Sequence, residues 1–212
     1  MGRKGDETRG RLLDATQGLI EAGGYFGAGL NQVIAASGMP RGSLYFHFPG
    51  GKDQLVAEAL RRAGRELGQM MRDLAESAPD APALVAGVLK LLGDRLEGSA
   101  WRKGCPVATV ALEMAAADDV LQQVCAEVYD AWEGVLRERL IADGHPDADD
   151  VATSVLALVE GRCCWRGRGA AGSRSTGRPG ASRSCSAADA GRGPVSACGA
   201  GREFVIACLK NM

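Results

Sequence analysis

The sequence predicts an all-α fold with a small N-terminal domain and a larger C-terminal domain. Apolar residues recur three and four positions apart over most of the first 161 residues, which is the spacing of one helix face. Glycines, prolines and capping residues separate these stretches, as expected at helix ends. No alternation of apolar and polar residues, the pattern typical of strands, is visible before Gly161. Such a chain is expected to pack helix on helix.

Four helices are expected in the N-terminal third. The first is expected to end at two adjacent glycines, positions 23 and 24, which interrupt its apolar pattern. Two short helices follow, over about 32–37 and 40–46, with a tight turn between them. The fourth is expected over about 52–76, because its apolar positions repeat without a break. A helix of that length can link a small domain to a second one.

The remaining helices are expected to form the larger domain. Two prolines within residues 77–82 break the chain after the long helix. Asp118 is expected to cap a later helix, which Gly144 and Pro146 are expected to end. The four helices of this region are expected over about 84–96, 106–116, 118–143 and 150–161.

The two short helices have the spacing of a helix-turn-helix, whose second helix enters the major groove of DNA. Asn31 is expected to cap the first, because its side-chain oxygen can accept from free backbone N–H groups. Gly38 lies where the turn needs a positive φ, which glycine adopts without steric cost. Pro40 suits the first position of the second helix, where its missing N–H is no loss.

The second helix is expected to present two different faces. Leu44, Phe46 and Phe48 are expected to pack on the core, which leaves alternate polar and aromatic side chains facing outward. Arginine can pair bidentately with guanine, and hydroxyl groups can reach phosphates or base edges. The candidate DNA-binding residues are Asn31, Gln32, Pro40, Arg41, Gly42, Ser43, Tyr45, His47 and Lys52. The alternative interpretation is an ordinary helical hairpin with a solvated face, because such a hairpin has the same spacing.

Five short motifs stand at fixed spacing in residues 8–60: RLLDAT at 11–16, GY at 24–25, VIAASG at 33–38, GSLYFHF at 42–48 and KDQL at 52–55. With these motifs the region resembles the DNA-binding domain of TetR-family repressors. Two details, Pro40-Arg41 and Pro49-Gly50-Gly51, depart from the commoner pattern and suit the branch of LmrA- and YxaF-like repressors, as does the later stretch KGCPVA at 103–108.

The resemblance implies a homodimer that binds a double-stranded DNA operator and a small-molecule effector. In this family the last helices form the dimer interface, and the C-terminal domain holds the ligand pocket. Methionine and aromatic side chains can line an adaptable pocket, although the same residues also serve as plain core. Together with scattered acids they suit an apolar or cationic compound. The candidate ligand-binding residues are Met70, Met71, Trp101, Cys105, Met114, Val128 and Trp132.

Charge is distributed unevenly along the chain. Residues 1–65 carry nine basic and six acidic side chains, a net charge of +3, whereas residues 66–161 carry seven and eighteen, a net charge of −11. A mildly basic N-terminal region fits phosphate contact, and the acidic middle is expected to lie away from DNA. The sequence has no run of about 18 apolar residues and no apolar secretory signal at its start, so a cytoplasmic location is expected.

The motifs of most enzymes and metal proteins are missing from the sequence. It has no GxSxG, no P-loop and no CxxC pair, and only two histidines accompany its seven cysteines. We therefore expect no catalytic residues, no metal and no cofactor. Cys105 stands at the beginning of an expected helix, where the pKa of its thiol can be lowered. Cys105 is therefore either a redox sensor or an ordinary small apolar residue of the core.

The composition changes after Gly161. Residues 162–202 hold eight arginines against one acid, Asp189, and helical periodicity vanishes, so residues 162–212 are expected to be an irregular tail. We hypothesise a shifted reading frame, because residues 162–165 can be encoded by CGC TGC TGC TGG, which one base earlier reads NCG CTG CTG CTG and encodes three leucines. A genuine basic tail is the alternative, and sequencing the gene around codon 161 distinguishes the two.

These observations divide the chain into a helix-turn-helix domain over 1–51, a ligand-binding and dimerisation domain over 52–161, and the tail. The expected function is a transcriptional repressor that a small molecule releases from its operator. A dimer weakened by the aberrant tail, and hence a dimerisation-defective regulator, is one alternative. The other is a helical small-molecule-binding protein that never binds DNA. Salt-dependent binding to promoter DNA separates a regulator from such a carrier.

Overall fold

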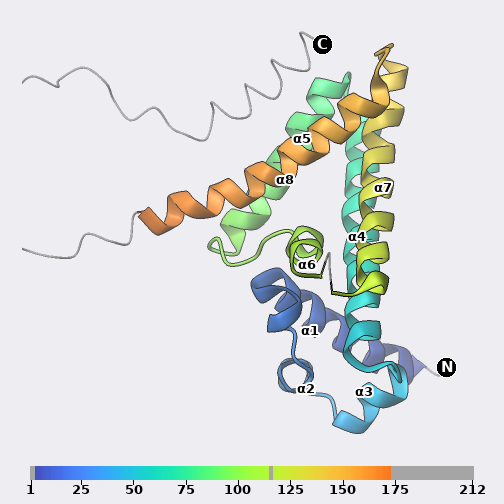
Figure 1. The fold of residues 1–212 in the computed structure, drawn as a ribbon, viewed down its shortest axis with the longest axis vertical. Coiled ribbons are helices and arrows are strands. Elements are labelled where there is room, and N and C mark those ends of the chain that lie inside the picture. Colours follow the sequence, from blue (N-terminus) through green and yellow to red (C-terminus); the bar gives the residue numbers. More distant parts are fainter. Residues whose placement is uncertain (1–2, 115–116, 173–212) are drawn as a thin grey trace, which may run out of the picture.

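A computed structural model describes residues 3–114 and 117–172, and every element in these ranges is a helix (Figure 1). Helix bounds agree with the sequence pattern to within a few residues, apart from the last helix. The helices are α1 (Arg3–Gly27), α2 (Leu30–Ser37), α3 (Arg41–His47), α4 (Gly51–Ser77), α5 (Ala81–Gly98), α6 (Pro106–Met114), α7 (Asp119–Ala142) and α8 (Ala148–Gly172).

Helices α1, α2 and α3 pack with the beginning of α4 at one end of the molecule (Figure 1). Their shared core consists of fully buried apolar side chains, including Leu12, Ile20, Val33, Leu44 and Phe48. These residues come from α1, α2 and α3 with its C-cap Phe48, so burying them fixes the short helices α2 and α3 in place. The N-terminal unit is therefore a three-helix head from which α4 extends.

Helix α4 runs the length of the larger domain beside α7 (Figure 1). The two helices approach closely at Gly64, whose carbonyl oxygen accepts a 2.9 Å hydrogen bond from the Trp132 indole. Helix α8 crosses α5 and packs on α7, and α6 packs against both α1 and α7. Helix α6 thus lies at the junction of the two domains.

Three helix ends differ from the sequence expectation. The N-cap of α2 is Gly29 rather than Asn31, because the helix begins two residues earlier than its apolar pattern suggests. Pro40 is the N-cap of α3 and lies just outside that helix. Helix α1 bends at Gly23 and Gly24 and resumes as far as Gly27.

The backbone of α8 is helical as far as Gly172, whereas the sequence predicts irregular chain from residue 162 onward. Extending an existing helix by one residue costs much less free energy than nucleating a new helix. Residues that are poor helix formers therefore do not end α8 immediately after Gly161. The rest of the expected tail, residues 173–212, and the frame-shift hypothesis for it lie outside the described residues. Within the described ranges, no helix has the length and apolar character to cross a membrane.

Candidate nucleic-acid interface and ligand cavity

The turn between α2 and α3 has the geometry that its sequence predicts. Gly38 adopts φ 66° and its N–H donates to the Ile34 carbonyl at 3.0 Å, which ends α2. The Ser37 hydroxyl then accepts from the Met39 N–H at 3.2 Å. These two hydrogen bonds stabilise the turn between the helices.

Most of the predicted DNA-binding side chains lie on one exposed edge of this unit. The Arg41 guanidinium donates to Asn31 Oδ1 at 2.6 Å, so the ends of α2 and α3 are joined on their outer side. Ser43 and His47 are half-buried, and Nδ1 of His47 is buried without a hydrogen-bond partner among the described residues. The exposed members are Asn31, Gln32, Pro40, Arg41, Gly42 and Tyr45.

The expectation that Phe46 packs on the core is wrong, because its side chain is 76 % exposed. Leu44 and Phe48 lie four positions apart and share the inner face of α3, so a residue midway between them points to the opposite side. The Phe46 ring stacks edge-on with His47, 5.1 Å between centroids. It therefore adds an aromatic group to the outer edge.

Lys52 is held at the beginning of α4 by aromatic side chains. Its ammonium lies 3.7 Å from the centroid of the Tyr25 ring, and the Tyr25 hydroxyl donates to Asp53 at 2.6 Å. Desolvation lowers the pKa of Lys52, whereas desolvation and the Asp53 carboxylate raise the pKa of Tyr25 to about 12. This arrangement fixes the position of the Lys52 side chain at the beginning of α4.

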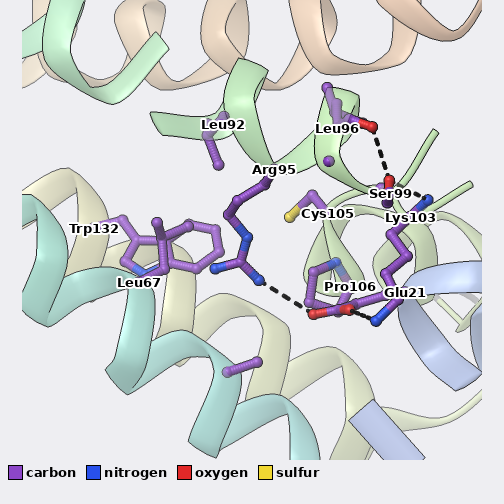
Figure 2. Close-up of a pocket in the computed structure, with 13 residues that line it drawn as sticks. Glu21, Leu67, Leu92, Arg95, Leu96, Ser99, Lys103, Cys105, Pro106 and Trp132 are labelled. Atoms are coloured by element: carbon purple, nitrogen blue, oxygen red, sulfur yellow. Dashed lines mark hydrogen bonds and ion pairs between the residues drawn. The ribbon is translucent and has the colours of Figure 1, made fainter. Parts of the chain in front are cut away.

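A cavity of about 330 Å³ lies in the larger domain and reaches the head (Figure 2). This volume is within the range of small-molecule sites. Apolar side chains from α4, α5 and α7 form much of its wall, and three charged groups project into it. The lining residues are Glu21, Ala63, Leu67, Leu92, Arg95, Leu96, Gly98, Ser99, Lys103, Gly104, Cys105, Pro106 and Trp132.

The charged groups of the cavity form one cluster (Figure 2). The Glu21 side chain, on α1, is only 8 % exposed and pairs with two cations. Arg95 Nη2 lies 3.2 Å from Glu21 Oε1, and Lys103 Nζ lies 3.1 Å from Oε2. A side chain of the head thus forms part of a cavity in the other domain.

Comparison with known proteins assigns both domains. Residues 12–59 match the family described as bacterial regulatory proteins of the tetR family, and residues 82–165 match the C-terminal domain of LmrA/YxaF-like transcriptional regulators. The chain is 36 % identical to the HTH-type transcriptional regulator LmrA of Bacillus subtilis (strain 168), over 73 % of this chain and 84 % of that protein. The chain belongs to the TetR family.

Other relatives agree with this TetR-family assignment. An uncharacterized HTH-type transcriptional regulator of Bacillus subtilis, YxaF, is 30 % identical over 76 % of this chain and 85 % of its own. A TetR transcriptional regulator from Chloroflexus aurantiacus superposes with a TM-score of 0.66 at 26 % identity, covering 79 % of this chain and 87 % of that one. These proteins are transcriptional regulators rather than enzymes.

The predicted ligand-binding residues of this TetR-family chain are dispersed in the structure. Cys105 and Trp132 line the cavity, and Met71 lines a much smaller hollow next to it. Val128 instead packs against Gly64 of α4. The other three, which are Met70, Trp101 and Met114, are not among the described residues that line the cavity.

Sequence reasoning did not find the charged groups of the cavity. Lys103 belongs to the KGCPVA stretch that resembles one TetR branch, so a signal for it was present. Arg95 lies in the last turn of α5 and Glu21 in a helix of the other domain, and no sequence pattern links them. Two of the three charged groups are cations, whereas the ligand that we expect from the sequence is an apolar or cationic compound.

The expectation of a lowered thiol pKa at Cys105 is wrong. Desolvation by the surrounding protein, followed by the nearby Glu160 carboxylate, raises the pKa of Cys105 well above its usual value. These effects outweigh the backbone N–H groups at the beginning of α6, which act in the opposite direction. The described residues also contain no group of three or more His, Cys, Asp or Glu arranged to hold a metal ion.

Proposed function

We propose that this TetR-family chain is a repressor that binds operator DNA through the exposed edge of α2 and α3. The observation that supports this most is the position of Arg41 and Tyr45, which lie four residues apart, one helical turn, on α3 and are both exposed. The head lies at the far end of the molecule from most of the acidic larger domain (Figure 1). Such a charge distribution favours one docking orientation on a polyanion.

We infer that a small molecule in the cavity releases the DNA. A ligand shifts an equilibrium only when it binds one conformation better than the other. Helix α4 begins at Gly51 in the head and lines the cavity through Leu67, so a shift of α4 at the cavity also moves the head. In this proposal the ligand favours a spacing of the heads that does not fit DNA, and the protein acts in the cytoplasm.

The proposal includes a homodimer, because two recognition helices one helical turn apart double the contacts with DNA. Leu158 on α8 is 42 % exposed, which supports the last helices as the surface that a second copy covers. The aberrant composition after Gly161 adjoins this surface in sequence, so we expect a weaker dimer than in relatives with a regular final helix.

Fluorescence anisotropy with the promoter fragment of the chain's own gene tests the DNA-binding site. We expect Arg41→Gln to weaken specific binding by about 1–3 kcal/mol, roughly fivefold to 150-fold, because a bidentate base contact is lost. Tyr45→Ala is expected to weaken it as well. Arg72→Gln is the matched control, since Arg72 is exposed on α4 within the larger domain. Unchanged affinity in the Arg41 and Tyr45 variants would count against this edge.

The same titration separates the regulator from the small-molecule carrier. A regulator binds promoter DNA with an affinity that falls steeply as salt increases, because counterions are released from phosphates. A carrier shows no binding to the fragment at any salt concentration.

A further inference from the structure

Glu21 connects the DNA-binding head to the ligand cavity. It belongs to α1, yet its carboxylate is buried in the cavity and uses both oxygens to hold Arg95 and Lys103 of the larger domain. Its backbone carbonyl also accepts from the Gly104 N–H at 2.9 Å. The segment that follows α5 is therefore attached to α1 through one residue.

The charge of the cavity is not balanced. Two cations face one carboxylate, and the side chains of Arg95 and Lys103 remain 41 % and 49 % exposed. A guanidinium carries five N–H donors, of which Glu21 receives one. Figure 2 shows the Arg95 side chain extending from α5 toward Glu21, with Leu67 and Trp132 on its other side. Further N–H donors of Arg95 thus lie next to the apolar wall that Leu67 and Trp132 form.

We propose that the cavity binds an aromatic carboxylate, whose anionic group takes Arg95 and Lys103 away from Glu21 and so loosens α1 from the larger domain. Bidentate pairing with a carboxylate is the geometry that a guanidinium favours, and Leu67, Leu92 and Trp132 suit an aromatic ring. The ligand also neutralises the excess positive charge. A cationic compound would be repelled by the side chains of Arg95 and Lys103.

Competition for two shared cations makes this coupling specific. A ligand carboxylate bound to Arg95 and Lys103 lies close to the Glu21 carboxylate, and the two negative charges repel each other. Ligand binding therefore weakens the ion pairs that connect Glu21 of α1 to Arg95 of α5 and to Lys103. The head then loses a constraint on its orientation. This inference rests on the proposed function, and reciprocity requires that bound DNA weaken ligand binding by the same factor.

Three probes of one shape test the ligand class on the full chain: 1-naphthoate, its neutral amide and 1-naphthylmethylamine. Calorimetry is expected to show that naphthoate binds at least tenfold more tightly than either of the others. Arg95→Gln and Lys103→Gln are each expected to reduce naphthoate affinity tenfold or more and to leave the amide unchanged. Arg102→Gln is the control, because Arg102 is exposed next to Lys103 and does not line the cavity.

Glu21→Gln tests the coupling. Removing the competing carboxylate is expected to raise naphthoate affinity at least threefold. Hydrogen exchange of the amides around residue 21 is expected to accelerate when naphthoate binds the wild type, and to change little in Glu21→Gln. Naphthoate is expected to weaken promoter binding by the wild type but not by this variant.

Two results would overturn the inference: naphthoate binding no tighter than its amide, or Glu21→Gln binding naphthoate less tightly than the wild type. A protein that prefers naphthoate and shows the exchange response but never binds DNA would refute the proposed function alone. A protein that binds its promoter but does not prefer naphthoate would refute this inference alone.

Discussion

Cys105 lies one residue before α6, where backbone N–H groups favour a thiolate. Two opposing effects are larger at this site. The surrounding protein desolvates the sulfur, and the Glu160 carboxylate, whose own pKa is raised by burial, adds negative charge nearby. The thiol therefore stays protonated at neutral pH, which argues against a redox sensor at this residue.

The raised pKa predicts slow alkylation of Cys105. Because only the thiolate reacts, iodoacetamide at pH 8 is expected to modify Cys105 at least tenfold more slowly in the folded protein than in urea. The folded rate is expected to keep rising above pH 9, since the thiolate is still scarce there. Peptide mass mapping separates this cysteine from the others. Equal rates in folded and unfolded protein at pH 8 would disprove the assignment.

At the scale of elements, the close contact between α4 and α7 depends on a glycine, Gly64, which has no side chain. A Cβ atom added at Gly64 would lie 2.6 Å from both γ carbons of Val128, inside van der Waals contact. The Gly64 carbonyl also accepts the Trp132 indole hydrogen bond, which is buried. Glycine is unfavourable within a helix, so its position at this crossing indicates close packing rather than flexibility.

Gly64→Ala is expected to destabilise the fold by about 1–3 kcal/mol, because the added methyl group overpacks the crossing. Gly10→Ala is the control. Gly10 lies within α1 with open space around its missing Cβ, so alanine there is expected to stabilise by up to about 1 kcal/mol through helix propensity. Thermal unfolding measures both. If the two variants change the melting temperature in the same direction, this account of α4 and α7 is wrong.

Local patterns in the sequence predicted the elements well. Gly38 was identified as the left-handed turn residue and Asp118 as a cap, and the structure confirms both. Phe46 and Asn31 were assigned wrongly, because apolar character and capping preference do not fix where a seven- or eight-residue helix begins or which way it faces. Glu21 was not identified as part of a site, since only tertiary packing brings it to α5.

At the scale of the whole molecule, polar contacts link the head to α5, α6 and the loop between them at two places. One is the Glu21 cluster at the cavity. In the other, Glu113 of α6 accepts from the Tyr25 N–H at 2.7 Å, and Tyr25 in turn contacts Lys52 and Asp53 at the beginning of α4. A displacement of α6 or of the cavity wall therefore changes the support of the same head residues. This arrangement gives the proposed effector a physical path to the DNA edge.

The central claim is that the edge of α2 and α3 lies in the major groove, and guanine methylation tests it most directly. Dimethyl sulfate attacks guanine N7, a major-groove atom that a bound arginine covers. On promoter DNA we expect two protected patches about ten base pairs apart, one for each subunit, and loss of protection with Arg41→Gln. Bound DNA with every guanine N7 reactive, or a pattern unchanged in Arg41→Gln, would contradict the account.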